Sequence, residues 1–153
     1  MKIKFYILSS IFFILDIISK NIIKINLNLY ESIEVIPNFF KLTYVINDGA
    51  AFSILKGKQL FLIILSIVFL LLIIQYINKE KLNNYKLIYY SLLTGGLLGN
   101  LFDRIIYKGV IDFLDFKILS YSAPIFNLAD TFIVISVFLI ILEIIKKDYL
   151  SKR

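Results

Sequence analysis

Long runs of apolar residues separated by short polar segments dominate the chain. Four runs are long enough for membrane-spanning helices, which need about 20 mostly apolar residues. They cover about residues 5–23, 59–77, 86–106 and 126–145. The first run follows Lys2 and Lys4, as a signal peptide would, but it contains Asp16 and Lys20 and has no small-residue cleavage site. We therefore predict that it is a retained span.

Two segments between the runs, at about residues 24–58 and 107–125, are too long for simple turns. The first contains S-I-E-V-I-P-N-F-F-K-L-T-Y, which alternates apolar and polar residues in parts, and turn signals at P-N and N-D-G. This pattern predicts a small sheet or hairpin on the outer membrane face. For residues 107–125 we expect an outer loop. The chain is thus predicted to be an all-α membrane protein, a single domain of four transmembrane helices with a small extracytoplasmic β-containing cradle.

Composition supports a membrane protein and gives its orientation. The chain is 59% hydrophobic and only 18% charged, whereas soluble domains have about a quarter charged residues. The net charge of +6 does not indicate a nucleic-acid partner, because the lysines stand mainly at the ends of apolar runs. Nine of the 17 positive charges fall in the tails and the short turn on one side: Lys2, Lys4, Lys79, Lys81, Lys86, Lys146, Lys147, Lys152 and Arg153. The positive-inside rule then places both termini in the cytoplasm.

The chain has no cysteine and no histidine. This excludes cysteine proteases, Ser-His-Asp triads, histidine-bound zinc and disulfide frameworks. Acid–base chemistry near neutral pH must therefore come from carboxylates, lysine, tyrosine or water. We expect no metal and no cofactor.

Polar residues inside the third run lie on one helical face. Gly96, Gly99, Asn100 and Asp103 are spaced i, i+3, i+4 and i+7. The glycines would let another backbone approach, and the two polar residues would then meet it. A plain packing seam, with Asp103 and Arg104 as an ion pair at the membrane surface, is an equally good interpretation of this stripe alone.

Other polar residues near the ends of the runs also have structural interpretations. Asn127 and Asp130 share a face of the fourth run, with the small Ala129 between them, but they could equally be an N-cap and a first-turn acid. Asp16 and Lys20, spaced i, i+4, could be an ion pair close to the outer surface.

Asp112 and Asp115 could be solvated loop acids, although apolar residues surround them. Under the predicted topology, Asp103, Asp112 and Asp130 nevertheless all lie at the same membrane face. A single shared site would account for the positions of all three. Two adjacent carboxyl groups that share a proton can activate water and bind a carbonyl oxygen, as in aspartic proteases. The residues alone do not choose between Asp103 and Asp112 as the partner of Asp130.

Five motifs in order resemble those of the lipoprotein signal peptidases (signal peptidase II), which are aspartyl proteases of the bacterial inner membrane. They are L-D-I-I-S-K at 15–20, N-D-G-A-A-F-S at 47–53, G-G-L-L-G-N-L-F-D-R at 95–104, V-I-D-F-L-D-F at 110–116 and F-N-L-A-D-T at 126–131. Each motif is weak alone, but the resemblance covers nearly the whole chain, residues 1–153.

The resemblance implies that Asp112 and Asp130 are the catalytic dyad. It gives Asp103 a structural role, through hydrogen bonds with Arg104 or Asn100. Site support and substrate binding would fall to Asp16, Lys20, Asn47, Gly49, Asn100, Asp103, Arg104, Asn127 and Ala129.

The resemblance also implies the substrate and the location. The family removes the signal peptide of a prolipoprotein just before a cysteine that carries diacylglycerol, and globomycin inhibits it. We therefore expect a multi-pass monomer in the bacterial cytoplasmic (inner) membrane, in contact with membrane lipids, with its active site at the outer face. Two positions depart from the family: Ile17 replaces a usual Gln, and Asp48 adds an acid near the site.

Two other functions remain open from the residues. A small carboxylate-based carrier is possible, because acids within membranes are common in carriers, but those are often built from repeats and this chain has none. A non-catalytic membrane scaffold assembled through the glycine stripe is the other.

Overall fold

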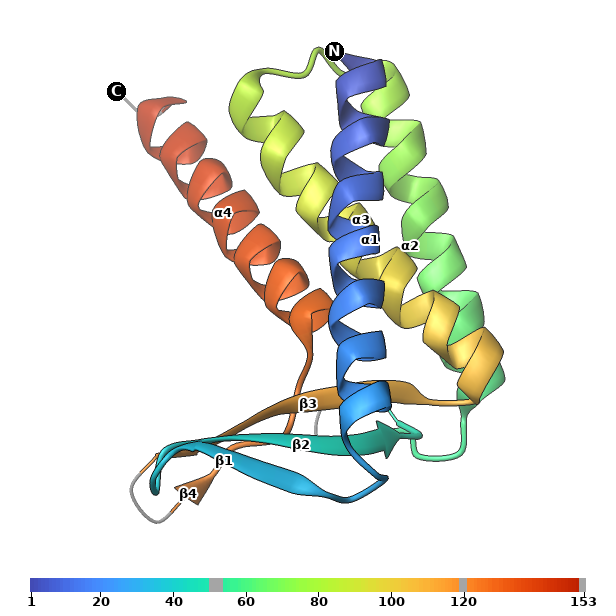
Figure 1. The fold of residues 1–153 in the computed structure, drawn as a ribbon. Helices are drawn as coiled ribbons and strands as arrows, with labels where there is room; N and C mark the ends of the chain where they lie inside the picture. The colour runs from blue at the N-terminus through green and yellow to red at the C-terminus, as the bar shows by residue number, and fades with distance from the viewer. Residues whose placement is uncertain (50–53, 119–120, 152–153) are drawn as a thin grey trace.

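The computed structural model describes residues 1–49, 54–118 and 121–151 and has four long helices standing on a small sheet (Figure 1). The helices are α1 (Lys2–Asn26), α2 (Gln59–Lys79), α3 (Asn84–Tyr107) and α4 (Leu128–Ser151). The strands are β1 (Ser32–Ile36), β2 (Phe40–Asn47), β3 (Val110–Ile118) and β4 (Tyr121–Ser122). The chain is thus mostly helical, and each predicted apolar run forms a helix. The ends lie within about three residues of the prediction except at α4, which continues six residues beyond residue 145. The start of α1 and the end of α4 lie at the end of the helices opposite the sheet (Figure 1).

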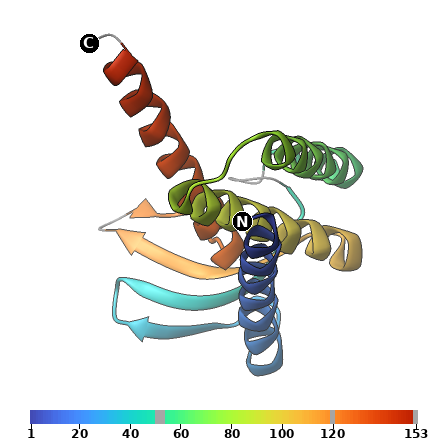
Figure 2. The same ribbon diagram turned by 90° about the horizontal axis from the view of Figure 1, so that it is seen from above.

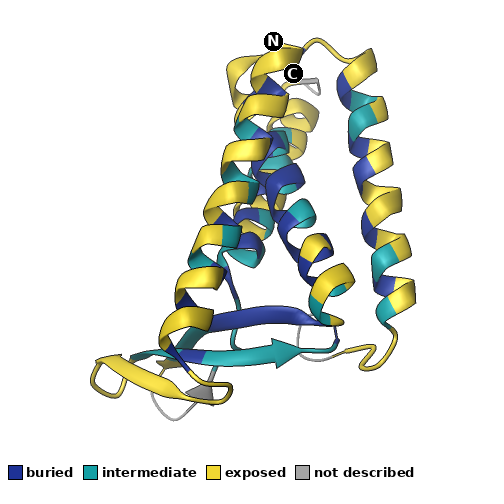
Figure 3. Cartoon of the chain, turned by 45° about the vertical axis from the view of Figure 1, so that its right-hand side comes forward, coloured by how far each residue is buried: buried dark blue, intermediate teal, exposed yellow. Residues whose placement is uncertain are grey.

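The outward faces of the helices carry many exposed apolar side chains. Figure 3 shows how much of α2 is exposed. This helix buries one narrow face: Leu62, Ser66, Leu70, Ile73 and Ile77. Most of its remaining apolar side chains are exposed, which a soluble protein would avoid but a lipid environment favours. Among the described helices, α1, α2 and α4 are long and apolar enough to cross a membrane. The helix α3 does not meet the same criteria of length and composition.

The central helix is α3, which packs against α1, α2 and α4. It buries many small and polar residues: Ser91, Thr94, Gly95, Gly96, Gly99, Asn100 and Asp103. Figure 2 shows α4 leaning away from the other helices and the sheet extending to one side of them. The polar face of α3 therefore meets its neighbours inside the protein.

The strands form one antiparallel sheet in the order β1-β2-β3-β4. The predicted hairpin is confirmed as β1 and β2. The expectation that Asp112 and Asp115 lie in a loop is wrong, because both are in β3, which pairs with β2 from Val110 to Phe116. The segment V-I-D-F-L-D-F-K-I is rich in β-branched and aromatic residues, which favour a strand. It also buries Val110, Ile111 and Phe113.

Two glycines on α3 allow the close contacts predicted for the small-residue face. A Cβ atom at Gly96 would lie 2.6 Å from the backbone oxygen of Ala129 in α4. A Cβ atom at Gly99 would collide with the carboxylate of Asp16 in α1. The packing-seam interpretation is therefore confirmed for these two positions, and the seam brings three helices together beside the polar residues of α3.

We expect Gly96→Ala to lower the free energy of unfolding by about 1–3 kcal/mol, because the added methyl group meets backbone that cannot rotate away. Thermal unfolding in detergent would measure this. Gly57→Ala is the control, since a Cβ atom there has nothing within 4 Å and meets only the strain of a φ of +74°. Equal melting temperatures for Gly96→Ala and the wild type would contradict the close contact.

Candidate active site

A cavity of about 890 Å³ lies where the helices meet the sheet. Its lining includes Asp112 from β3, Asp130 from the first turn of α4, Asn47 from β2, and Asn100 and Arg104 from α3. One wall is mostly apolar and contains Ala123, Pro124, Ile125, Phe126, Ile133, Val134 and Ile135. Asp112 and Asp130, the two acids that the family resemblance singled out, thus face one cavity.

Asp112 is almost completely buried, with 2% of its surface exposed. Its Oδ1 accepts a hydrogen bond from Asn127 Nδ2 at 2.7 Å, and its Oδ2 accepts one from Asn47 Nδ2 at 3.0 Å. Burial, with a further contribution from the charge of Asp130, raises the pKa of Asp112 to about 7. This carboxyl group can therefore hold a proton near neutral pH.

Asp130 and Asn127 exchange hydrogen bonds at the start of α4. The backbone N–H of Asp130 donates to Asn127 Oδ1 at 2.8 Å, and the backbone N–H of Asn127 donates to Asp130 Oδ2 at 3.3 Å. This reciprocal pattern is that of a capping box, so the N-cap interpretation is confirmed. It does not exclude a role in the site, because Asn127 Nδ2 remains available to Asp112. One asparagine therefore links both carboxylates.

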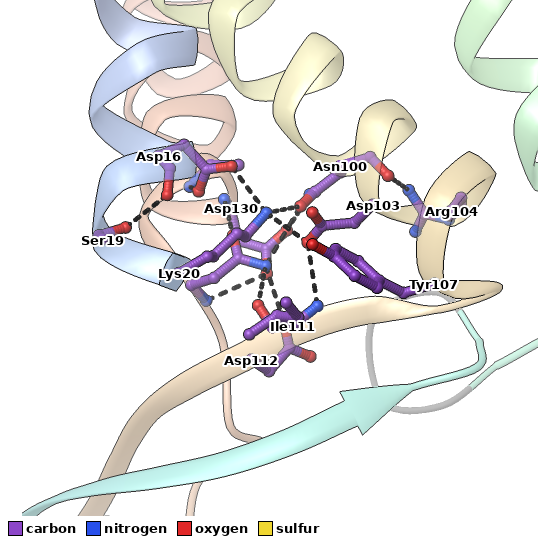
Figure 4. A network of polar contacts seen from close by, with 12 residues as sticks. Asp16, Ser19, Lys20, Asn100, Asp103, Arg104, Tyr107, Ile111, Asp112 and Asp130 are labelled. Atoms are coloured by element: carbon purple, nitrogen blue, oxygen red, sulfur yellow. Dashed lines mark hydrogen bonds and ion pairs between the residues drawn. The ribbon is translucent and has the colours of Figure 1, made fainter. Parts of the chain in front are cut away.

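Asn100 completes the hydrogen bonds to the acids (Figure 4). Its Nδ2 donates to Asp130 Oδ1 at 2.7 Å. Its Oδ1 accepts from Lys20 Nζ at 3.2 Å and from Asn127 Nδ2 at 3.1 Å. Each of the four carboxylate oxygens of the two acids thus receives at least one N–H donor.

A buried ionic cluster lies behind Asn100. Lys20 Nζ is 2.7 Å from Asp16 Oδ2 and 2.9 Å from Asp103 Oδ2, and all three side chains are at most 2% exposed. The predicted pairing of Asp16 with Lys20 is confirmed. Asp16 Oδ1 also accepts from the backbone N–H of Ala129, and Asp103 Oδ2 from that of Ile111.

The expected partners of Asp103 are wrong. It bonds to Lys20 and Ile111 rather than to Arg104 or Asn100. Consecutive residues on a helix do not face each other, which explains why Arg104 points elsewhere. Arg104 donates to the backbone oxygens of Asn100 at 3.3 Å and of Gly49 at 3.5 Å.

Only the first three residues of the N-D-G-A-A-F-S motif, 47–49, can be placed, because residues 50–53 lie outside the described residues. The backbone N–H of Gly49 donates to Asn47 Oδ1 at 2.9 Å, which turns the amide nitrogen of Asn47 toward Asp112. Asp48 lies at the cavity and pairs with Lys56 at 3.8 Å.

Sequence reasoning missed part of the cavity lining, including Tyr30, Lys56, Thr131 and Ile133. Ile133 could have been found, because it follows Asp130 by three residues on the same helix and shares its face. No sequence signal marks Tyr30, which reaches the cavity from the turn before β1.

Comparisons with known proteins agree with this geometry. The family model described as signal peptidase (SPase) II matches residues 8–146. The chain belongs to the signal peptidase II family. The resemblance drawn from the five motifs is thereby confirmed. The family is one of proteases, and with its apolar helices the chain is a bacterial membrane protein.

Relatives and solved structures of similar length accompany this match. The lipoprotein signal peptidase of Staphylococcus haemolyticus is 42% identical over 152 residues, which are 95% of this chain and 96% of that protein. That of Staphylococcus epidermidis is 40% identical over 159 residues, covering 100% of this chain and 99% of that protein. A bacterial membrane enzyme solved by the in meso method at 2.3 Å has a TM-score of 0.89 and 37% identity, covering 97% of this chain and 91% of that one. A second, at 1.9 Å, has a TM-score of 0.84 and 37% identity, covering 93% and 92%.

The raised pKa of Asp112 predicts a pH-dependent stability. The folded protein holds this proton more tightly than the unfolded chain, whose carboxyl has the ordinary value of 3.8. The resulting stability is fully present below about pH 4 and is lost as the pH rises through about 7, by up to a few kcal/mol. The melting temperature should therefore fall over this range, and Asp112→Asn should remove that part of the fall.

Asp115→Asn is the matched control, because Asp115 lies on the same strand and bonds to Thr43 Oγ1 outside the acid pair. It should keep the pH dependence of the wild type. Parallel melting profiles for the wild type and Asp112→Asn would contradict the raised pKa.

Proposed function

We propose that this protein removes the signal peptide from diacylglyceryl-modified prolipoproteins, cleaving before the lipidated cysteine, with Asp112 and Asp130 as its catalytic dyad. The observation that carries the proposal is that two carboxylates from different elements face one cavity and are linked by Asn127. Membership in the signal peptidase II family supports the substrate. The names of the staphylococcal relatives support it as well.

The pair can hydrolyse an amide with one shared proton. The ionised carboxylate removes a proton from water while the water oxygen bonds to the carbonyl carbon, and the protonated carboxyl gives its proton to the carbonyl oxygen. The carbon–nitrogen bond of this gem-diol then breaks as the first carboxyl protonates the leaving nitrogen and the second takes a proton from a hydroxyl. One water is consumed, a carboxyl and an amine are formed, and the pair regains its single proton. The chemistry requires neither a metal nor a cofactor.

The surroundings of Asp103 support a structural role for it. Its carboxylate is 1% exposed, is held by Lys20 and Ile111, and does not line the cavity. Asp112 has the same degree of burial but does line the cavity. A water or a peptide in the cavity could therefore reach Asp112 but not Asp103.

The cavity suits a lipidated peptide held at a membrane surface. Its apolar wall, with Phe126, Ile133 and Val134, offers contacts for apolar side chains or lipid, while the polar groups gather beside the two acids. The diacylglyceryl group would anchor the cysteine, and hence the scissile bond, near the membrane surface. We propose that globomycin-type inhibitors occupy the same cavity.

We also propose that α3 is a fourth span and that residues 1–153 form one peptidase domain that works as a monomer. A helix of 24 residues is about 36 Å long, enough for a hydrocarbon core of about 30 Å. Its polar residues face α1 and α4 rather than lipid, as is usual within membranes. With the termini in the cytoplasm, the sheet and the dyad then lie at the outer face.

Replacing either acid of the dyad should abolish cleavage. With a diacylglyceryl-modified prolipoprotein peptide in detergent, Asp112→Asn and Asp130→Asn should each lower kcat/KM by about 10³-fold or more, since neither amide can exchange the proton. Asp115→Asn should cleave like the wild type. Near-normal cleavage by folded Asp112→Asn or Asp130→Asn would refute the catalytic assignment.

Single-cysteine labelling would test the topology, and the absence of native cysteines makes the signal unambiguous. In intact cells a membrane-impermeant maleimide should label Lys117→Cys, at the exposed end of β3, but not Lys81→Cys, in the exposed turn between α2 and α3. Permeabilised cells should show labelling at both positions. Labelling of both positions in intact cells would contradict a membrane between them.

A further inference from the structure

Three asparagine amides surround the acid pair, and each has only one possible orientation. Asn47 Oδ1 accepts from the backbone N–H of Gly49, and Asn127 Oδ1 accepts from that of Asp130. Because backbone N–H groups only donate, the amide nitrogens of both residues must point toward the acids. The orientation of Asn100 is set differently, by a side-chain charge.

Lys20 sets the orientation of Asn100. Its ammonium group has three donors and no acceptor, so the atom of Asn100 that lies 3.2 Å away must be the amide oxygen. Its other two partners are the carboxylates of Asp16 and Asp103, which use the remaining donors. Among the described residues Asn100 is thus the one neutral partner of Lys20, and its N–H is directed at Asp130 Oδ1.

The negative charge of a carboxylate is not stabilised equally at the two acids. Asp130 accepts from an amide that a buried ammonium polarises, and from a backbone N–H at a helix N-terminus, where negative charge is favoured. Asp112 lies on a strand, and its donors in the described part of the chain are the neutral amides of Asn47 and Asn127. The site therefore stabilises negative charge better at Asp130 than at Asp112.

We propose that Lys20 is a positioning residue for the reaction: acting through Asn100, it keeps the negative charge of the pair on Asp130 and leaves the shared proton on Asp112. This inference rests on the proposed function and assigns the roles within it. Asp130 removes the proton from water, and Asp112 donates to the carbonyl oxygen. The pKa of Asp112, raised to about 7, is consistent with the proton residing there.

The other charged groups around the pair do not reverse this assignment. Arg104 lines the cavity and bonds only to backbone oxygens among its described contacts. The carboxylates of Asp16 and Asp103 are paired with Lys20, and Asp48 is paired with Lys56 at an exposed position. Arg104 meets the backbone of Asn100, whereas Lys20 is the charge that contacts its side-chain amide.

A direct test locates the proton without using activity. In infrared spectra of the detergent-solubilised protein near pH 6, the band of a protonated carboxyl should disappear in Asp112→Asn and persist in Asp130→Asn. Loss of the band in Asp130→Asn and its retention in Asp112→Asn would overturn the proposal. A failure of the catalytic dyad would instead appear as continued cleavage by these variants.

The role of Lys20 is tested by a variant that leaves the net charge of the cluster unchanged. Lys20→Gln combined with Asp16→Asn removes one positive and one negative charge, and Asp103 keeps its hydrogen bond from the backbone N–H of Ile111. The acidic limb of kcat/KM against pH should move up by about one unit or more, and kcat should fall at least about tenfold with little change in KM. An unchanged pH profile would show that Lys20 only joins α1 to α3.

Two further variants complete the design. Lys24→Gln is the matched control: Lys24 lies one turn along α1 and bonds to Tyr107 Oη at 3.0 Å without reaching Asn100, so its pH profile should remain that of the wild type. Asn100→Asp keeps the size of the side chain and the contact with Lys20 but turns an acceptor toward Asp130. It should shift the acidic limb in the same direction even if the double variant does not fold. A wild-type profile for folded Asn100→Asp would overturn the proposal.

Discussion

The contact between Lys20 and two aspartates, buried away from both water and lipid, is the constraint on which the rest of the site depends. Charges in such a place must be matched and hydrogen-bonded, since an unpaired buried charge costs several kcal/mol. The lysine belongs to α1 and its partners to α1 and α3. Each aspartate also holds a backbone N–H, Asp16 at the start of α4 and Asp103 at the start of β3. The elements that carry Asp130 and Asp112 are therefore fixed to the same three charges. A buried ionic cluster adds little to the stability of a protein. Its main consequence here is that it fixes the positions of the elements that carry the two acids.

Asn127 shows how closely folding and site geometry are joined. Its backbone and side-chain oxygen take part in the cap of α4, and its side-chain nitrogen bonds to Asp112 and Asn100. An aspartate at this position would cap the helix as well but would present an oxygen to Asp112, where two acceptors would meet. Serine or threonine would cap without reaching the strand. The choice of asparagine is thus explained by the site rather than by the helix.

Much of this arrangement was predictable from local patterns, and the remainder depends on contacts between distant residues. Apolar runs identified all four helices, the i, i+4 spacing identified the pairing of Asp16 with Lys20, and the motif order identified the family. The strand β3 was missed because its partner in β2 lies some 70 residues earlier, and its apolar residues suit a membrane-facing loop equally well. The partners of Asp103 were missed for the same reason. Neighbours in sequence suggested Arg104 and Asn100, but the helix turns Asp103 toward Lys20, which is 83 residues away.

The sheet supplies the surroundings that the proposed dyad needs in order to work near neutral pH without histidine. A carboxyl group exposed to water loses its proton near pH 4, and two exposed groups would both be ionised and could not share a proton. Here β3 crosses the ends of the helices and keeps Asp112 at 2% exposure. Asp112 nevertheless lines the cavity, so a peptide bound there would lie beside it. A membrane helix alone would place Asp130 at the interface with water beside it. The strand thus supplies both the second acid of the proposed dyad and the low-polarity surroundings in which the two could share a proton.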